Sequence, residues 1–447
     1  MAEQQTIFAL SSGHGRAGVA VIRISGPTAG VALDRMTPPR PKPRSAAFRR
    51  VRHPETGEVL DEALALWLPG PGTETGEDMA ELHVHGGRAV IAGVLAALGG
   101  LPGCRLAEPG EFARRAFLNG KVDLTAAEAI ADLVDAETAA QRRQALRQAG
   151  GALAQLYDAW RADLIRAQAL TEAAIDFADE ADVGARACEE ARALVAGLLP
   201  QTRRHLDDGR RGEIVREGFR VAIAGPPNVG KSSLLNALAR REAAIVSDEA
   251  GTTRDVIEVT LDLGGVPVIL SDTAGLREAS GKVEREGIRR AVARARDADL
   301  VLWLMDAADP QPALPPDLLR GSGEMLWVLN KTDLVAGDSG RLAADPGWLR
   351  MSVLTAEGLP ELIRTIEARA AAAAGACETP VITQARHRQQ IEATAEALDA
   401  YLSGAPADLE LRAEDLRRAA TALGRITGRV DAEDVLAEIF GRFCIGK

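Results

Sequence analysis

Two glycines five positions apart, followed by a lysine and a serine in GPPNVGKS at residues 225–232, give the strongest chemical signal in this sequence. It matches the pattern GxxxxGK[ST], follows the apolar run RVAIA and precedes SSLLNALAR, which has the composition of a helix. In such a loop the backbone amides and the helix N-terminus bind phosphate oxygens. Lys231 is expected to reach the β- and γ-phosphates, and Ser232 to hold Mg²⁺. The pattern therefore predicts a nucleoside triphosphate site.

Three later segments follow in the order that a guanine-nucleotide site requires. DTAG begins at Asp272 after an apolar run, so its carboxylate is expected to reach Mg²⁺ through water and Gly275 to sense the γ-phosphate. NKTD ends at Asp333, which can accept hydrogen bonds from the N1–H and 2-amino group of guanine. Adenine offers neither group there, so the sequence predicts GTP rather than ATP. Residues 352–354 are expected to complete the base pocket, with Val353 where alanine is usual.

The predicted nucleotide contacts fall in five short segments. They are Asn228, Val229, Gly230, Lys231, Ser232 and Ser233; Ser247, Asp248, Glu249, Ala250, Gly251, Thr252 and Thr253; Asp272, Thr273, Ala274 and Gly275; Asn330, Lys331, Thr332 and Asp333; and Ser352, Val353 and Leu354.

The residue after DTAG indicates an unusual way of orienting the attacking water and of supplying positive charge to the phosphates. Many GTPases place a water-orienting glutamine there, but this chain has Leu276. No arginine finger is evident, although Arg254 and Arg277 are candidates. A bound monovalent cation could supply the charge, held by the Asn228 side chain and by backbone carbonyls of residues 247–253. Thr253 is then expected to bind Mg²⁺. For Asn228, a role in stabilising the loop alone is as strong an expectation as a role in binding the cation.

Sequence texture predicts a multidomain chain. Residues 1–120 alternate short strand-like runs with glycine and proline, which indicates an α+β domain, and residues 121–214 have helical periodicity. Asp123 or Thr125 could cap the first helix. Residues 215–375 alternate buried strands and helices as in a doubly wound α/β domain, and residues 376–447 are helical again. We therefore expect a helical domain interrupted by an inserted P-loop GTPase domain of the Ras-like α/β type.

Composition limits the possible partners and location. The formal net charge is −11, so an RNA substrate would require a partner protein or a local basic patch. The stretches at 38–45 and 310–316 read as loops, not interaction tracts. The first residues lack a secretory signal pattern, no apolar run is long enough to span a membrane, and the four cysteines form no CxxC pair. We expect a reduced, cytoplasmic protein.

Motifs along the whole chain resemble the MnmE (TrmE) family of tRNA-modification GTPases. They are VIRISG, LWLPGP, TGED, HGG, PGEFARRAFLNGK, GPPNVGKSSLLNAL, AGTTRD, DTAGLRE and a final FCIGK. The resemblance implies an N-terminal folate-binding and dimerising domain, and a helical domain split by the GTPase domain.

The resemblance also implies an activity and its residues. Family members hydrolyse GTP with K⁺ in place of an arginine finger, and a glutamate matching Glu284 positions water. With the flavin-dependent partner MnmG (GidA) they add an aminomethyl or carboxymethylaminomethyl group at C5 of the wobble uridine of certain tRNAs, using 5,10-methylene- or 5-formyl-tetrahydrofolate. The matching residues are Glu284, Asn228, Thr253, Lys231 and Cys444 for catalysis; Arg23, Glu81, Lys121 and Lys447 for folate; Ser232 and Thr253 for Mg²⁺; and Asn228, Ser247, Glu249 and Thr252 for K⁺.

Several alternatives stay open at this point. Cys444 could be a nucleophile or a packing residue. His83 and His85 share one face of a strand, but no third ligand is spaced to join them in a metal site. The chain could instead be a regulatory GTPase of ribosome assembly that binds RNA directly, or a folate-dependent aminomethyltransferase in which GTP is only structural.

Overall fold

The computed structural model describes most of the chain. The described residues are 5–13, 15–177, 181–241, 243–245, 258–272, 297–310, 324–335, 347–375, 380–405, 408–430, 436, 439–441, 443, 445 and 446, without the side chains of 181–183 and 245. Contacts divide the chain into two compact units, one with residues 1–131, 149–162 and 420–447, and the other with residues 132–148 and 163–419.

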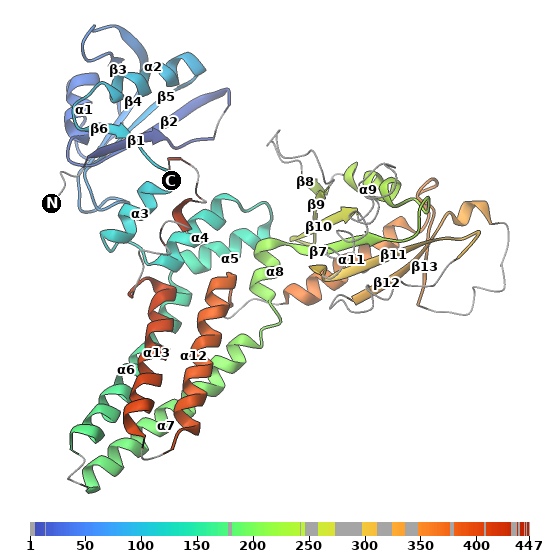
Figure 1. Ribbon diagram of the computed structural model, residues 1–447. Coiled ribbons are helices and arrows are strands. Elements are labelled where there is room, and N and C mark those ends of the chain that lie inside the picture. The colour runs from blue at the N-terminus through green and yellow to red at the C-terminus, as the bar shows by residue number, and fades with distance from the viewer. Residues whose placement is uncertain are drawn as a thin grey trace, which may run out of the picture. The chain divides into compact units, whose positions relative to one another are not determined.

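The first unit is built on a six-stranded sheet, confirming the α+β prediction (Figure 1). The strands run in the spatial order β3-β4-β5-β2-β1-β6, and all neighbours are antiparallel except β1 and β6. Their bounds are β1 (Thr6–Leu10), β2 (Ala17–Ser25), β3 (Ala47–Arg52), β4 (Val59–Leu68), β5 (Met79–Gly86) and β6 (Cys104–Leu106).

The two faces of this sheet are covered unequally. Helices α1 (Ala29–Met36) and α2 (Arg88–Gly99) bury one face in a continuous apolar core. On the other face α3 (Glu111–Leu118) places Phe112 against Ile7 and Ala9 of β1. Exposed apolar side chains remain toward the β3 edge, including Phe48 and Leu64, which lie opposite each other on β3 and β4.

Long helices make up the helical part of the chain. They are α4 (Leu124–Val134), α5 (Ala139–Ala149), α6 (Ala152–Asp176), α7 (Ala181–Leu206), α8 (Arg211–Glu217), α12 (Ala385–Ser403) and α13 (Leu409–Thr427). Asp123 caps α4, because its Oδ1 accepts hydrogen bonds from the Thr125 and Ala126 amides at 2.8 and 3.1 Å. The Tyr401 hydroxyl of α12 lies 3.2 Å from the Thr171 hydroxyl of α6, so helices that precede and follow the α/β part in the sequence pack together.

A seven-stranded sheet forms the α/β part, in the order β13-β12-β11-β7-β10-β9-β8. The strands are β7 (Phe219–Ala224), β8 (Ala244–Ile245), β9 (Glu258–Leu263), β10 (Val266–Asp272), β11 (Leu300–Asp306), β12 (Glu324–Asn330) and β13 (Leu349–Arg350), with the helices α9 (Lys231–Ala239), η2 (Thr332–Leu334) and α11 (Leu359–Ala374). The central strands are parallel, as their nearly continuous apolar sequences predict. Their carboxyl ends therefore gather the predicted nucleotide motifs at one edge.

Candidate functional site

The glycine-rich loop lies between β7 and α9, as predicted. Gly225 has φ +148° and Gly230 has φ +98°, and a Cβ at Gly225 would lie 2.2 Å from the Leu304 carbonyl oxygen. Asn228, at the exposed tip of the loop, is also left-handed, with φ +61°. These positive φ angles let the loop turn tightly enough for successive backbone amides to point toward a phosphate.

Lys231 and Ser232 begin α9 and place the charged groups of the site. The buried Lys231 ammonium donates to the carbonyls of Gly225 and Pro226 at 3.0 and 2.8 Å. Burial lowers its pKa, and the Asp272 carboxylate opposes this shift. The charge therefore lies inside the loop, where the β- and γ-phosphates are expected.

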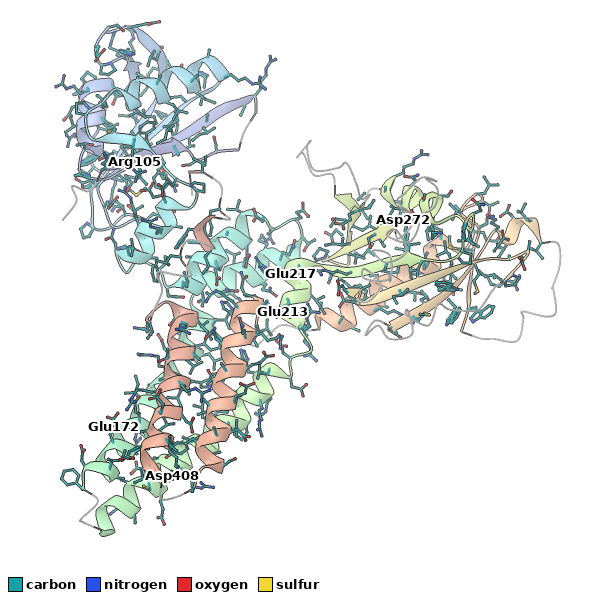
Figure 2. The ribbon with its side chains drawn as sticks, viewed as in Figure 1. Arg105, Glu172, Glu213, Glu217, Asp272 and Asp408 are labelled. Atoms are coloured by element: carbon teal, nitrogen blue, oxygen red, sulfur yellow. The ribbon has the colours of Figure 1, made fainter. Side chains whose placement is uncertain are left out.

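Ser232 and Asp272 come together across two elements. The Ser232 hydroxyl donates to Asp272 Oδ2 at 2.7 Å, and Asp272 ends β10 beside α9 (Figure 2). Hydroxyl and carboxylate oxygens are the donors that Mg²⁺ prefers. Thr253 and the remaining switch residues, 247–253 and 273–275, lie outside the described residues.

Asn330 joins the base-binding loops to the phosphate loop. Its buried side-chain amide donates to the Val229 carbonyl at 2.8 Å, and its Oδ1 accepts from the Val353 amide at 3.1 Å. Val353 thus contributes its backbone amide. The Ser352 hydroxyl donates to Asp333 Oδ1 at 2.5 Å and fixes this carboxylate.

Other predicted residues make fewer contacts. Thr332 donates its amide to the Met351 carbonyl at 3.3 Å. Ser233 is exposed on α9, and the Leu354 side chain is 85% exposed, so neither encloses the pocket in this conformation.

Asp306 is a site residue that the sequence reasoning missed. Lys331 Nζ lies 2.8 Å from its Oδ2, and the Ala308 amide donates to its Oδ1 at 2.9 Å. Burial opposes ionisation, but these hydrogen bonds outweigh it and hold the pKa of Asp306 below its usual value. The available signal was an acidic residue ending the buried strand LVLWLMD, directly beside the strand that leads into NKTD.

A second cluster of charged side chains lies on the N-terminal sheet. Strand register places Arg23 opposite Glu81, and Arg23 Nε donates to Glu81 Oε1 at 3.2 Å. Arg23 Nη1 also lies 2.7 Å from Glu74 in the loop between β4 and β5. His83 Nε2 lies 3.0 Å from Glu81 Oε2, whereas His85 pairs with Asp61 at 2.8 Å, so each histidine has its own carboxylate partner.

Lys121 contacts the same β4–β5 loop at another point. Its ammonium donates to the Pro71 carbonyl at 2.8 Å, and no described contact joins it to Arg23 or Glu81. Lys447, Cys444 and Glu284 lie outside the described residues. The residues around the FCIGK motif are tied to the N-terminal sheet: the Ser11 hydroxyl donates to the Gly446 carbonyl at 2.8 Å, and Ile445 pairs with Pro109.

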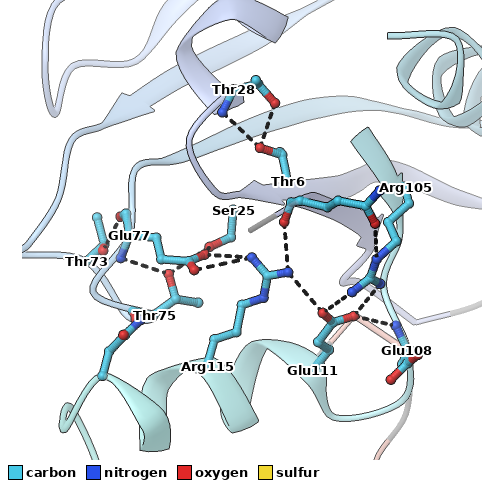
Figure 3. Close-up of polar contacts among 12 residues, drawn as sticks. Thr6, Ser25, Thr28, Thr73, Thr75, Glu77, Arg105, Glu108, Glu111 and Arg115 are labelled. Carbon is cyan, nitrogen blue, oxygen red and sulfur yellow. Dashed lines mark hydrogen bonds and ion pairs between the residues drawn. The ribbon is translucent and has the colours of Figure 1, made fainter. Parts of the chain in front are cut away.

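A buried ionic network joins the loop between β4 and β5 to α3 (Figure 3). Arg115 lies 3.0 Å from both Glu77 and Glu111, and Arg105 lies 2.6 Å from Glu111. Burial opposes ionisation of Glu111, but hydrogen bonds from Arg105, from the Glu108 amide and from Arg115 lower its pKa to about 2. Ser25 of β2 donates to Glu77 at 2.7 Å, so strand, loop and helix are joined.

The residues predicted to bind phosphate, Mg²⁺ and guanine converge at the carboxyl ends of the parallel strands of one sheet, and this arrangement is that of the class of P-loop GTPases. Models of two families match the chain: the MnmE helical domain over residues 124–444, and the N-terminus of GTP-binding protein TrmE over residues 6–121. The chain belongs to the MnmE (TrmE) family.

Relatives match over nearly their full length. The chain is 55% identical to the tRNA modification GTPase MnmE of Parvibaculum lavamentivorans, covering 99% of this chain and 100% of the relative. It is 52% identical to the MnmE of Rhodospirillum rubrum, covering 99% of each. Among solved structures, the G domain of the T. maritima FeoB iron transporter covers 34% of this chain and 98% of its own length at 29% identity, with a TM-score of 0.27.

None of the described helices is both long and apolar enough to cross a membrane.

Proposed function

We propose that this protein is a K⁺-stimulated GTPase that acts in the cytoplasm with a flavin-dependent partner, MnmG. Together they add a folate-derived one-carbon unit, as part of an aminomethyl or carboxymethylaminomethyl group, to C5 of the wobble uridine of certain tRNAs. The observation that carries the proposal is that a chain matching an MnmE relative over 99% of its residues brings together Ser232 with Asp272, Ser352 with Asp333, and Arg23 with Glu81.

Phosphate binding depends on groups that already point toward one another. Lys231 brings a fixed positive charge into the loop, and Ser232 and Asp272 offer two hard oxygen ligands 2.7 Å apart. Mg²⁺, when bound, neutralises charge on the β- and γ-phosphates. The chain's own contribution is to hold these donors in place before the substrate arrives, which lowers the cost of reorganisation.

Guanine selectivity follows from the fixed Asp333 carboxylate. Ser352 holds one of its oxygens, and Asn330 holds the surrounding loops to each other. Guanine can donate to this carboxylate from N1–H and the 2-amino group, whereas adenine offers it neither of these donors. An unpaired charge in a base pocket is costly, so the pocket selects GTP.

The K⁺ proposal depends on Asn228. Its left-handed conformation at the exposed loop tip leaves its amide oxygen free to approach a cation between the phosphates. Ser247, Glu249 and Thr252 are the further proposed ligands, with Thr253 on Mg²⁺ and Glu284 positioning water.

The folate proposal fits the chemistry of the first unit. A pterin ring presents an amidine-like edge that pairs with a carboxylate, which Glu81 offers, and the glutamate tail of a folate requires cations, which Arg23 and Lys121 offer. The folate, when bound, supplies the one-carbon unit. We also propose Lys447 as a folate contact and Cys444 as a reactive thiol, since the flanking residues Ile445 and Gly446 contact this domain.

The incompletely covered sheet face supports a homodimer. One row across four strands contains Phe48, Leu64, His83 and Val21, and Phe48 is 63% exposed. Burying such apolar side chains against a second copy contributes about 25 cal/mol per Å².

GTP turnover in KCl and in NaCl at equal ionic strength tests the catalytic proposal. We expect faster turnover in KCl, and an Asn228→Ala variant that no longer distinguishes the salts. Equal rates for the wild type in both salts would remove the cation from the mechanism.

Mass analysis of wobble uridines tests the biological role. A deletion strain should lose the C5 modification, and the wild-type gene should restore it. Retention of the modification together with a defect in ribosome assembly would instead support the regulatory alternative. Restoration of the modification by a Lys231→Ala gene would favour a transferase that uses GTP only structurally.

A further inference from the structure

The outer edge of the six-stranded sheet concentrates positive charge. β3 is the edge strand, and the segment before it continues the same edge, because Pro43 bridges to Trp67 of β4 and the Arg44 amide donates to the Trp67 carbonyl at 2.8 Å. Residues 42–52 contain five cations and no carboxylate. We call these five the basic edge: Lys42, Arg44, Arg49, Arg50 and Arg52.

Most of this charge is held in place without being neutralised. Arg44 donates to the Gly72 carbonyl at 2.6 Å, Arg49 to the Pro39 carbonyl at 3.0 Å and Arg52 to the Gly57 carbonyl at 3.1 Å. Carbonyl oxygens fix a guanidinium and leave its net charge intact. Within the described part of the chain, only Arg50 of the five has a carboxylate partner, Glu62, at 2.8 Å.

The charge of this edge contrasts with that of the whole chain. Because the chain carries −11 and residues 42–52 carry +5, the other residues together carry −16. A polyanion is therefore repelled by most of the protein and attracted here. Electrostatic attraction of this kind is what directs nucleic acids to a protein surface.

An exposed strand edge could instead pair with a second copy of the chain. Two basic edges brought together would place five cations against five, and like charges on opposing strands are destabilising. Pairing of this strand edge with the same edge of a second copy is therefore unfavourable. Arg49, Arg50 and Arg52 belong to the extended strand β3, and Lys42 and Arg44 lie in the turn before it, where the Ser45 amide donates to the Lys42 carbonyl at 3.1 Å. The five cations therefore lie within one short stretch that successive phosphates can contact.

Helix α5 offers a smaller group of cations. Arg142, Arg143 and Arg147 lie on its exposed face. However, Asp132, Asp135 and Glu217 line a cleft beside the same helix, together with Gln141 and Gln144. Mixed charge makes this surface a weaker binder of polyanions, and it provides a matched control.

We infer that the basic edge is a docking surface for the phosphate backbone of tRNA. The inference rests on the proposed action on tRNA and adds to it the surface that an acidic chain needs for direct contact with RNA. The carbonyl contacts pre-position the guanidinium groups, so less side-chain entropy is lost when phosphates bind.

Binding of an unmodified tRNA transcript tests this inference, measured by fluorescence anisotropy between 50 and 200 mM salt. The variant Lys42→Gln/Arg44→Gln/Arg49→Gln removes three charges from the edge. We expect binding at low salt to be weaker by a factor of about ten or more, and a slope of log K against log salt that is less steep by about 3. The control Arg142→Gln/Arg143→Gln/Arg204→Gln removes three exposed charges elsewhere and should behave as the wild type.

Two further measurements separate binding from folding and from catalysis. The charge-retaining variant Lys42→Arg/Arg44→Lys/Arg49→Lys should recover most of the salt dependence. GTP turnover should be unchanged in all three variants, because none alters the nucleotide site. If wobble uridines proved not to be the target while edge-dependent tRNA binding persisted, the proposed function would fail and this inference would stand.

Three results would overturn the inference. One is a wild type that does not bind the transcript at 50 mM salt. Another is an edge variant whose slope of log K against log salt equals that of the wild type. The cations would then serve only to prevent the exposed strand from pairing with another chain. The third is an equal loss in the control variant, which removes two arginines of α5 and Arg204 of α7. That result would mean that net charge alone governs binding.

Discussion

The nucleotide site and the N-terminal sheet site use charged side chains in opposite ways. In the nucleotide site, Lys231, Asp272 and Asp333 lie at or just beyond the carboxyl ends of parallel strands: Lys231 begins α9, Asp272 ends β10, and Asp333 lies in η2 after β12. In the N-terminal site, Arg23, Glu81 and Glu74 come from two antiparallel strands and a loop. Backbone geometry prepares the first site, and pairing between distant side chains prepares the second. Mutations should therefore abolish chemistry in the first site and disturb ligand binding or folding in the second.

Replacing Lys231 should give the largest effect. Lys231→Ala removes the buried cation from the phosphate loop, and we expect GTP turnover to fall about 10³-fold, as when a preorganised charge-stabilising donor is lost. Single-turnover assays measure this. Arg240→Ala, an exposed residue just beyond α9, is the control and should keep wild-type turnover. A Lys231→Ala enzyme within threefold of wild type would refute the assigned role.

Replacing Glu111 tests whether the first unit depends on its ionic network. Glu111→Gln leaves Arg105 and Arg115 without their shared carboxylate, and we expect a loss of about 3 kcal/mol in the free energy of unfolding at pH 7. Urea titrations followed by circular dichroism measure it. The exposed Glu108, 3.9 Å from Arg114, is the control, because Glu108→Gln should cost under about 0.5 kcal/mol.

The stability difference between the wild type and Glu111→Gln should depend on pH. The folded-state pKa of Glu111 is about 2, below the ordinary value of 4.5, so its ionised form stabilises the folded protein above pH 4.5. This stabilisation is lost as the pH falls from 4.5 toward 2. The difference between wild type and Glu111→Gln should shrink across that window, and a constant difference would contradict the assigned pKa.

Replacing Arg23 should weaken folate binding without affecting the nucleotide site. We expect Arg23→Ala to bind 5-formyl-tetrahydrofolate about 10- to 100-fold more weakly, since a charged hydrogen bond is lost. Isothermal titration calorimetry measures the affinity. GTP turnover should stay at the wild-type rate in the absence of the partner, and unchanged folate affinity would remove Arg23 from the site.

The smallest effect is expected at Asp306. Asp306→Asn keeps the shape of the side chain but weakens its hold on Lys331, and we expect GDP and GTP to bind about three- to fivefold more weakly. Stopped-flow binding of a fluorescent nucleotide would show this, with kcat at saturation unchanged. A fall in kcat without a change in affinity would mean that Asp306 acts on the chemical step.

The sequence by itself determined the fold class and the placement of the glycine-containing loop, DTAG and NKTD at the ends of apolar strands. This was possible because parallel strands have continuous apolar sequences and because a phosphate loop needs glycines at fixed spacing. Tertiary structure decided the choice of Asp123 as the cap of α4, the support of Lys331 by Asp306 and the partners of His83 and His85. It also placed the basic segment from Lys42 to Arg52 at one edge of a sheet, although the stretch 38–45 read as a plain loop. These outcomes depend on which strands become neighbours, and the spacing of residues along a chain does not specify that.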